Sequence, residues 1–358
     1  MSAPRLERAV SIAQGRALVS GDLATVSWLT GLEPEIEWGP SPFSAPPLVV
    51  VGSDGTVTAV VSEDEAPGVA EGIEVLSFPG FALEDVDRPA AALTRALEAV
   101  GNDSSLAVEL HSLPGALVAA LGDRELVDVR SSLQAERAVK DPDEIEAIRS
   151  AVAVADVGQD AARAGLRAGP TELELWSVVR AAMEREAGAR IPVLADFVTG
   201  ERTAEVGGPP GERRLGPGDL LLVDLVPRPS AYWADSCATL ALGEPPTPAR
   251  EAHASALAAL EAAKAAIAPG VKAGEVDRAA RSLTEPHGGY PHHTGHGLGL
   301  TVHEAPRIVP SAQTPLAEGM VIALEPGAYG DGWGVRVEQV VVVTAEGCEV
   351  LSGHDLAL

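Results

Sequence analysis

The chain has 358 residues, 46% of them hydrophobic, with a formal net charge of -26 and a pI near 4.6. One compact core rarely organises a chain of this length, so two domains are expected. A surface this acidic repels phosphate backbones and anionic lipid headgroups. The charge therefore argues against a nucleic-acid-binding protein and against a membrane-surface protein.

The number of cysteines and the length of the apolar runs indicate the cellular compartment in which the protein is expected. Cys237 and Cys348 are too few for a disulfide framework and fit a reducing cytosol. The opening residues, MSAPRLERAV, lack the apolar core of a signal peptide. The longest apolar runs, such as Leu220–Val223 and Val340–Val343, have the length of strands and not of a spanning helix. We therefore expect a cytoplasmic protein that does not cross a membrane.

Residues 1–131 have the pattern of an α/β domain. A first helix is expected to run to about Val19. The segment LVVVGSDGTVTAVV places two β-branched runs around Ser53-Asp54-Gly55, which predicts a β-hairpin. A helix over Ala90–Val100, a short buried strand over Leu106–Leu110 and a helix from about Pro114 are expected to follow.

The pattern changes near Ser131, where we place the boundary to a second domain of residues 132–358. The segment Asp141-Pro142-Asp143-Glu144 predicts a helix start, because proline suits the first turn and acidic residues suit the positive helix end. Long alanine-rich helices follow. Thr171 and Glu174 form a capping box that opens another helix.

An internal repeat organises this second domain. RAGPTELELW (167–176) resembles APGVKAGEVD (268–277), and LGPGDLLLVD (215–224) resembles LAEGMVIALE (316–325), both at an offset of 101 residues. The shared offset predicts two related halves, each a helix pair followed by a strand that ends in a carboxylate. Repeats of about 100 residues are too long for a solenoid. A pseudo-symmetric domain with its site between the halves is therefore expected.

Four carboxylates lie at related positions in the two halves. Asp224 follows the apolar run LLLV, and Asp235 follows a loop that contains two prolines. Glu325 follows the run MVIAL, and Glu338 lies within GVRVEQVVVV. A carboxylate in an apolar strand is costly unless it is paired or binds a metal. The symmetric arrangement therefore favours a ligand site over four unrelated turn residues.

A histidine cluster completes this set. Four of the eight histidines fall in PHHTGHGLGLTVHEAP: His292, His293, His296 and His303. Glycines flank His296 and allow the backbone to approach a ligand closely. Four carboxylates and one imidazole suit two divalent ions, with Mn²⁺ favoured and Co²⁺, Zn²⁺ or Fe²⁺ as alternatives. Two such ions can activate a water molecule and polarise a carbonyl group.

At these residues the sequence resembles the creatinase/aminopeptidase P/prolidase family of pita-bread metallopeptidases. The resemblance rests on GHGLGLTVHEAP, ALEPG, GVRVE and the spacing of the two aspartates, and it covers most of the chain. DLATVSWLTGL and AVKDPDEIEAIR resemble the family's N-terminal segment and linker helix. The resemblance implies an α+β protein, with an N-terminal creatinase-type α/β domain and a C-terminal pita-bread domain of two pseudo-symmetric halves.

The resemblance also implies a role for each matching residue. It gives five metal ligands: Asp224, Asp235, His296, Glu325 and Glu338. Glu325 would also transfer the proton of the attacking water, and His303 would stabilise the oxyanion. His292 would line the pocket on the proline side of the substrate. Arg336, also counted among the substrate-binding residues, would hold carboxylates that surround the metal ligands.

The sequence departs from the family pattern at Gly207, where members usually carry a histidine that contacts the substrate near the scissile bond. Val226, Cys237 and Ala238 also replace residues that are common in the family. These departures indicate a divergent subgroup. They leave a small-molecule lyase of the same fold open as an alternative.

The leading hypothesis is a dipeptidase for the Xaa-Pro bond, of the bacterial prolidase type. The length and single N-terminal domain fit this class, and Arg307 could pair with a dipeptide's free carboxylate. A Xaa-Pro aminopeptidase for longer peptides and a metal-free binding module of the same fold are further alternatives. Family members are commonly homodimers in which one N-terminal domain helps to close the partner's site, so a homodimer is expected.

Overall fold

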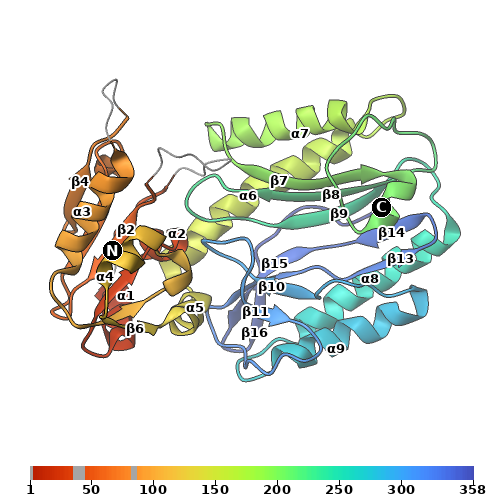
Figure 1. The fold of residues 1–358 in the computed structure, drawn as a ribbon. Helices are drawn as coiled ribbons and strands as arrows, with labels where there is room; N and C mark the ends of the chain where they lie inside the picture. Colours follow the sequence, from red (N-terminus) through yellow and green to blue (C-terminus); the bar gives the residue numbers. More distant parts are fainter. Residues whose placement is uncertain (1–2, 35–44, 82–86) are drawn as a thin grey trace. The chain divides into compact units, whose positions relative to one another are not determined.

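The computed structural model describes residues 3–34, 45–81 and 87–358, and Figure 1 shows their path. The chain divides into two compact units, Met1–Arg137 and Ala138–Leu358. The expected boundary at Ser131 lies inside helix α5 (Arg130–Ala138). Each unit has its own buried apolar core.

The first unit is a six-stranded mixed sheet with strand order β4-β3-β2-β1-β5-β6. Its strands are β1 (Ala17–Ser20), β2 (Leu48–Val51), β3 (Val57–Ser62), β4 (Glu74–Phe78), β5 (Ser105–Val108) and β6 (Glu125–Asp128). Its other helices are α1 (Ala3–Ala13), α2 (Leu23–Thr30), α3 (Arg88–Val100) and α4 (Gly115–Leu121). Strands β1, β2 and β3 pair antiparallel, whereas β4, β5 and β6 join their neighbours in parallel.

Most elements predicted for this unit are confirmed. Strands β2 and β3 form the predicted hairpin, and α3, β5 and α4 lie where helix, strand and helix were expected. The first helix, expected to reach Val19, is a wrong prediction because α1 ends at Ala13. Gln14 and Gly15 have φ values of 52° and 81°, which no α-helix can contain. Val19 is instead fully buried in β1.

The second unit contains two helix pairs, two sheets and one hairpin. The helices are α6 (Pro142–Gly165), α7 (Glu172–Ala187), α8 (Thr247–Ala266) and α9 (Ala273–Thr284). One sheet has the order β7-β8-β9, with β7 (Val193–Thr199), β8 (Leu220–Pro227) and β9 (Ser236–Ala241). The other has the order β11-β10-β12-β15-β16, with β10 (Gly295–Gly297), β11 (Glu304–Ile308), β12 (Val321–Leu324), β15 (Gln339–Thr344) and β16 (Gly347–Val350). The hairpin joins β13 (Gly327–Gly330) to β14 (Trp333–Arg336).

Each helix pair covers one sheet, as Figure 1 shows. Helices α6 and α7 pack on the first sheet through a core that includes Met183, Phe197 and Val223. Helices α8 and α9 pack on the second through a core that includes Leu260 and Ile322. The two sheets are linked where the Glu338 amide donates to the Cys237 carbonyl over 2.8 Å. The strand residues that carry the candidate ligands therefore lie between two helical layers.

Matching backbone contacts confirm the two related halves. An isolated bridge pairs Thr171 with Arg214 in the first half and Lys272 with Pro315 in the second, again at an offset of 101. Each bridge ties the start of the second helix of a pair to the segment that leads into a central strand. The α+β class is confirmed as well.

The predicted capping box of α7 is present, and the predicted helix start at Asp141 also carries one. The side chains of Asp141 and Glu144 exchange hydrogen bonds with the first turn of α6, and those of Thr171 and Glu174 do so in α7. Each box satisfies two backbone amides that a helix start leaves unpaired. Within the part of the chain that the structure describes, no helix is long and apolar enough to cross a membrane.

One strand differs from its prediction. Asp224 was expected to end a strand, but β8 continues through it to Pro227. Both edges of β8 are paired at this point, with Asp196 of β7 on one side and Cys237 of β9 on the other. This double pairing extends the strand. In the second half, β12 ends before Glu325, and the next residue is Pro326, which has no amide hydrogen for a sheet.

Gln159 in α6 links β8 to β9 from inside the core. Its Nε2 donates to the Val223 carbonyl at 3.1 Å, and to the carbonyl and hydroxyl of Ser236 at 3.0 Å each. Val223 directly precedes Asp224, and Ser236 directly follows Asp235. One buried amide therefore holds both carboxylate-bearing segments of the first half.

Replacing Gln159 by leucine should lower the free energy of unfolding of the second unit by about 1–3 kcal/mol, because buried hydrogen bonds are lost without gain of a partner. Urea denaturation measures this change. The exposed Gln313→Leu is the matched control and should leave the free energy nearly unchanged. Equal stability of the two variants would show that the Gln159 amide does not link the strands.

Candidate metal centre and substrate pocket

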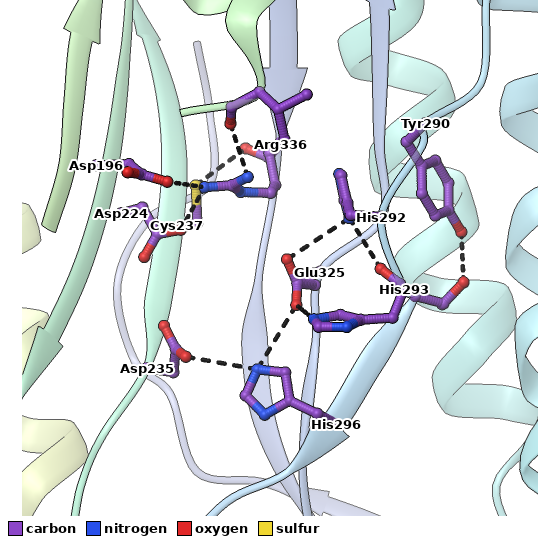
Figure 2. A network of polar contacts seen from close by, with 12 residues as sticks. Asp196, Asp224, Asp235, Cys237, Tyr290, His292, His293, His296, Glu325 and Arg336 are labelled. Atoms are coloured by element: carbon purple, nitrogen blue, oxygen red, sulfur yellow. Dashed lines mark hydrogen bonds and ion pairs between the residues drawn. The ribbon is translucent and has the colours of Figure 1, made fainter. Parts of the chain in front are cut away.

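The five predicted metal ligands come together from both halves of the second unit. Asp224 lies within β8, Asp235 directly before β9, His296 in β10, Glu325 directly after β12 and Glu338 directly before β15. All except Asp224 are buried residues, and the Asp224 side chain is only 13% exposed. Figure 2 shows four of them facing a common space.

His296 lies between carboxylates of the two halves. Its Nε2 is 3.5 Å from Asp235 Oδ2 and 3.6 Å from Glu325 Oε1. Candidate ligand atoms of Asp235, His296 and Glu338 all lie within 4.8 Å of one another. These separations exceed ordinary hydrogen-bond lengths. Distances of this size are expected between ligand atoms that surround one cation.

Two buried carboxylate oxygens also fit cation binding. Among the described residues, Oδ1 of Asp224 and Oε1 of Glu338 have no hydrogen-bond partner. Burial raises the pKa of Asp224 well above its ordinary value, and repulsion from Asp235 adds to this against the opposing effect of Arg336. Burial and repulsion from Asp235 likewise raise the pKa of Glu338. Divalent cations would remove this repulsion, so the residue set fits the metal ions that the sequence implied.

Glu325 has a different environment from the other carboxylates. His293 Nε2 lies 2.7 Å from Glu325 Oε1, and His292 Nδ1 lies 3.7 Å from Oε2. Burial opposes ionisation, but the hydrogen bond from His293 and the charge of Arg336 outweigh it and lower the pKa of Glu325 to about 2. Glu325 is therefore ionised at neutral pH. The role of His293 was not predicted, although it stands next to His292 in the sequence.

Arg336 is buried beside Asp224, as Figure 2 shows. Its Nη2 donates to Asp224 Oδ2 and lies 3.3 Å from Asp196 Oδ2. Its Nη1 donates to the Val206 carbonyl over 2.9 Å. The sequence predicted that Arg336 holds carboxylates around the metal ligands, but it identified neither Asp196 nor the direct contact with Asp224. The sequence could have pointed to Asp196 only if the register of β7 against β8 had been known, because that register places Asp196 opposite Asp224.

The predicted substrate residues lie on the other side of Glu325. His292 Nε2 is 3.1 Å from the Tyr329 hydroxyl, and burial lowers the His292 pKa to about 4. Arg307 is exposed, and its Nη2 lies 3.3 Å from His293 Nδ1. Arg307, His292 and His293 line a cavity of about 540 Å³. The structure thus brings two of the three predicted substrate residues together in one pocket, whereas the third, Arg336, pairs with Asp224.

His303 lies against His296, one of the candidate metal ligands. Its ring centroid is 4.3 Å from that of His296. Burial, followed by the charge of His296, lowers the pKa of His303, so its imidazole is neutral at pH 7. The next residue is held by a buried ion pair, because Lys140 Nζ lies 2.7 Å from Glu304 Oε2. This pair fixes the segment that carries His303.

A second buried network holds the histidine segment. Thr294 Oγ1 donates to Asp277 Oδ1 over 2.6 Å, and Arg281 pairs with the same carboxylate at 3.0 Å. Arg281 also donates to the carbonyls of Tyr290 and His292, at 2.8 Å and 3.0 Å. These contacts fix the backbone of the histidine segment. They were not predicted, because nothing in the local sequence pattern relates α9 to this loop.

Comparisons with known proteins identify the family and the fold of the chain. The sequence model of metallopeptidase family M24 matches residues 146–345. YkvY of Bacillus subtilis, provisionally named a dipeptidase, is 34% identical over 240 residues, which make up 66% of this chain and 66% of that protein. An uncharacterized peptidase of Staphylococcus aureus strain USA300 is 32% identical over 243 residues, or 67% of this chain and 69% of that protein. The chain spans about two thirds of the length of these curated relatives.

Solved structures match over nearly the whole chain. The prolidase from Pyrococcus horikoshii OT3 has a TM-score of 0.85 at 26% identity, over 99% of this chain and 100% of that one. Dipeptidase PepE from Mycobacterium ulcerans has a TM-score of 0.80 at 28% identity, over 99% and 96%. The X-Pro aminopeptidase from Thermotoga maritima MSB8, at 24% identity and a TM-score of 0.82 over 99% of both chains, supports the fold alone. The predicted pita-bread fold is confirmed.

Loading the protein with Mn²⁺ should place about two ions on each chain and raise the midpoint of thermal unfolding, because the cations offset carboxylate repulsion. Elemental analysis and calorimetry measure the two effects. Asp235→Asn should reduce both while circular dichroism stays unchanged, and the exposed Asp331→Asn should reduce neither. Full metal content in Asp235→Asn would contradict the assignment of this ligand.

Proposed function

Because the chain belongs to metallopeptidase family M24, we propose that it is a prolidase-like enzyme that cleaves the Xaa-Pro bond of dipeptides with two divalent ions. The family makes it a hydrolase that acts on peptides. The observation that supports a dipeptide as the substrate is the pocket next to Glu325, which is lined by Arg307, His292 and His293. Mn²⁺ is the proposed metal, because four of the five ligands are carboxylates.

The ions would be held by the set of five ligands: Asp224, Asp235, His296, Glu325 and Glu338. Bound there, they would supply Lewis-acid activation of the attacking water and of the scissile carbonyl. Arg336 fixes the carboxylate of Asp224, and the burial of Arg336 limits the access of water to that side. Groups that orient ligands in this way strengthen metal binding.

Glu325 is the proposed general base. Its lowered pKa keeps the carboxylate ionised, and the hydrogen bond from His293 fixes its orientation. It accepts a proton from the attacking water and delivers that proton to the proline nitrogen as the C–N bond breaks. The products are a free amino acid and free proline.

His303 is the proposed oxyanion donor. Its neutral imidazole carries one N–H, which can donate to the carbonyl oxygen as negative charge develops there. The pair of Lys140 with Glu304 limits movement of this segment. Catalysis by such a donor depends on its fixed position, so this restraint supports the role.

Arg307 is the proposed recognition group for the dipeptide's free carboxylate. Its guanidinium lies beside His293, at the mouth of the cavity. An internal proline in a longer peptide has no free carboxylate to offer this group. A charged group that loses its partner discriminates strongly against such a substrate.

His303→Ala should lower kcat on Ala-Pro by a factor on the order of 10²–10³, with metal content unchanged, because it removes one oxyanion donor. Steady-state kinetics and elemental analysis of the same preparation measure the effect. A change confined to KM would instead make His303 a residue for substrate binding.

Ala-Pro should be cleaved far better than Ala-Pro-Ala or Ala-Pro-amide, since only the dipeptide offers a free carboxylate to Arg307. Arg307→Ala should narrow this difference, mainly by slowing the dipeptide. Chromatography of the products measures all three substrates. If the tripeptide is the better substrate, the enzyme is a Xaa-Pro aminopeptidase. If none is cleaved with both ions bound, the chemistry is that of another reaction, such as a lyase.

We also propose that the protein works as a cytoplasmic homodimer, on the basis of its family and of its two free cysteines. Light scattering of the purified protein should give twice the chain mass of 36.7 kDa. A monomer with full activity would contradict the proposed assembly.

A further inference from the structure

Asp196 is an acidic residue at the rim of the metal centre. It lies in β7, the edge strand of its sheet, directly opposite Asp224 of β8. Opposed residues of paired strands project to the same face of a sheet. The Asp196 side chain is 39% exposed, whereas that of Asp224 is 13% exposed. Asp196 therefore continues the row of carboxylates beyond Asp224, as Figure 2 shows, and it is the more exposed of the two.

The backbone opposite Asp196 is shaped to make room for it. A β-carbon on Gly207 would overlap the Asp196 carboxylate, so position 207 cannot carry a side chain while Asp196 is in place. The preceding residue, Val206, has φ 75° and ψ -36°, a costly conformation for a β-branched residue. The hydrogen bond from Arg336 to the Val206 carbonyl holds this conformation. The Asp196 carboxylate thus occupies the space that a side chain at position 207 would enter.

The carboxylates of Asp196 and Asp224 have one arginine between them as a counter-ion. This arginine is Arg336. On the far side of Glu325 the groups are cationic or imidazole, namely Arg307, His292 and His293. The site therefore has a partly exposed carboxylate at β7, Asp196, and an exposed guanidinium at β11, Arg307. A substrate bound between these two groups would place its proline carboxylate toward Arg307 and its first residue toward Asp196.

We propose that Asp196 is a specificity-determining residue that attracts a positive charge on the residue before proline. Dipeptides with lysine or arginine in that position are favoured, and dipeptides with aspartate or glutamate are disfavoured. This inference rests on the proposed cleavage of Xaa-Pro dipeptides. The inference places Asp196 near the scissile bond, in the space next to Gly207.

A purely structural role for Asp196 makes a different prediction. If Asp196 served only as a counter-ion of Arg336, its loss would disturb the positions of Arg336 and Asp224. That disturbance would be the same whichever substrate is bound. Activity on basic, neutral and acidic dipeptides would then fall by one common factor. A role in specificity changes the ratio between basic and acidic substrates instead.

The test compares kcat/KM for Lys-Pro, Ala-Pro and Glu-Pro in the Mn²⁺-loaded parent enzyme, in Asp196→Asn and in the exposed Glu186→Gln, which changes the net charge equally. The parent should prefer Lys-Pro to Glu-Pro. Asp196→Asn should reduce that preference by about 10-fold, mainly through KM, as expected for one partly exposed charge pair. Glu186→Gln should retain the preference, and metal content should be equal in all three proteins.

Gly207→Ala provides a second, independent variant, because the added methyl group should displace the Asp196 carboxylate and reduce the same preference. An unchanged Lys-Pro to Glu-Pro ratio in Asp196→Asn, or an equal loss on all three dipeptides, would overturn the inference. If the parent cleaves no dipeptide, the proposed function fails separately. Calorimetric binding of Lys-Pro and Glu-Pro to the parent and to Asp196→Asn would then decide the role of Asp196.

Discussion

Mutual repulsion among four buried carboxylates is the constraint on which the second unit depends. Asp235, Glu325 and Glu338 come within reach of one imidazole, and Asp224 lies close enough to Asp235 to repel it. In the described chain, one oxygen of Asp224 and one of Glu338 lack a hydrogen-bond partner. The chain itself offsets only part of this charge, through Arg336 at Asp224 and His293 at Glu325. An arrangement this costly is maintained when cations complete it. Metal ions bound there would therefore stabilise the folded state as well as supply the proposed chemistry.

The scaffold around this centre is built from contacts that fix strand and loop positions. Gln159 holds the two segments that carry Asp224 and Asp235. In the second half, Asp277 and the carbonyl contacts of Arg281 hold the histidine segment. Related halves thus meet one requirement with different residues. The pseudo-symmetry supplies paired strands that face one another, and each half then adapts its own side chains to the ligands that it provides.

Local pattern was sufficient for much of this structure. The 101-residue offset predicted the two halves, and alternation of apolar runs with carboxylates predicted the ligand-bearing strands. Short-range chemistry predicted the start of α6 and the capping box of α7, but it missed the break at Gln14, where backbone angles and not composition end the helix. Asp196 and Asp277 could not be predicted, because their roles depend on strand register and on packing between distant segments. Gly207 appeared in the sequence only as a missing histidine, and the structure relates it to Asp196.

Anomalous X-ray scattering from crystals of the Mn²⁺-loaded protein tests this arrangement most directly. Two anomalous peaks are predicted, about 3.5–4 Å apart and bounded by the same five side chains: Asp224, Asp235, His296, Glu325 and Glu338. Arg336 should remain on Asp224, outside the ligand sphere. Peaks at other residues, or carboxylates that stay in place with no anomalous signal between them, would contradict a two-metal centre.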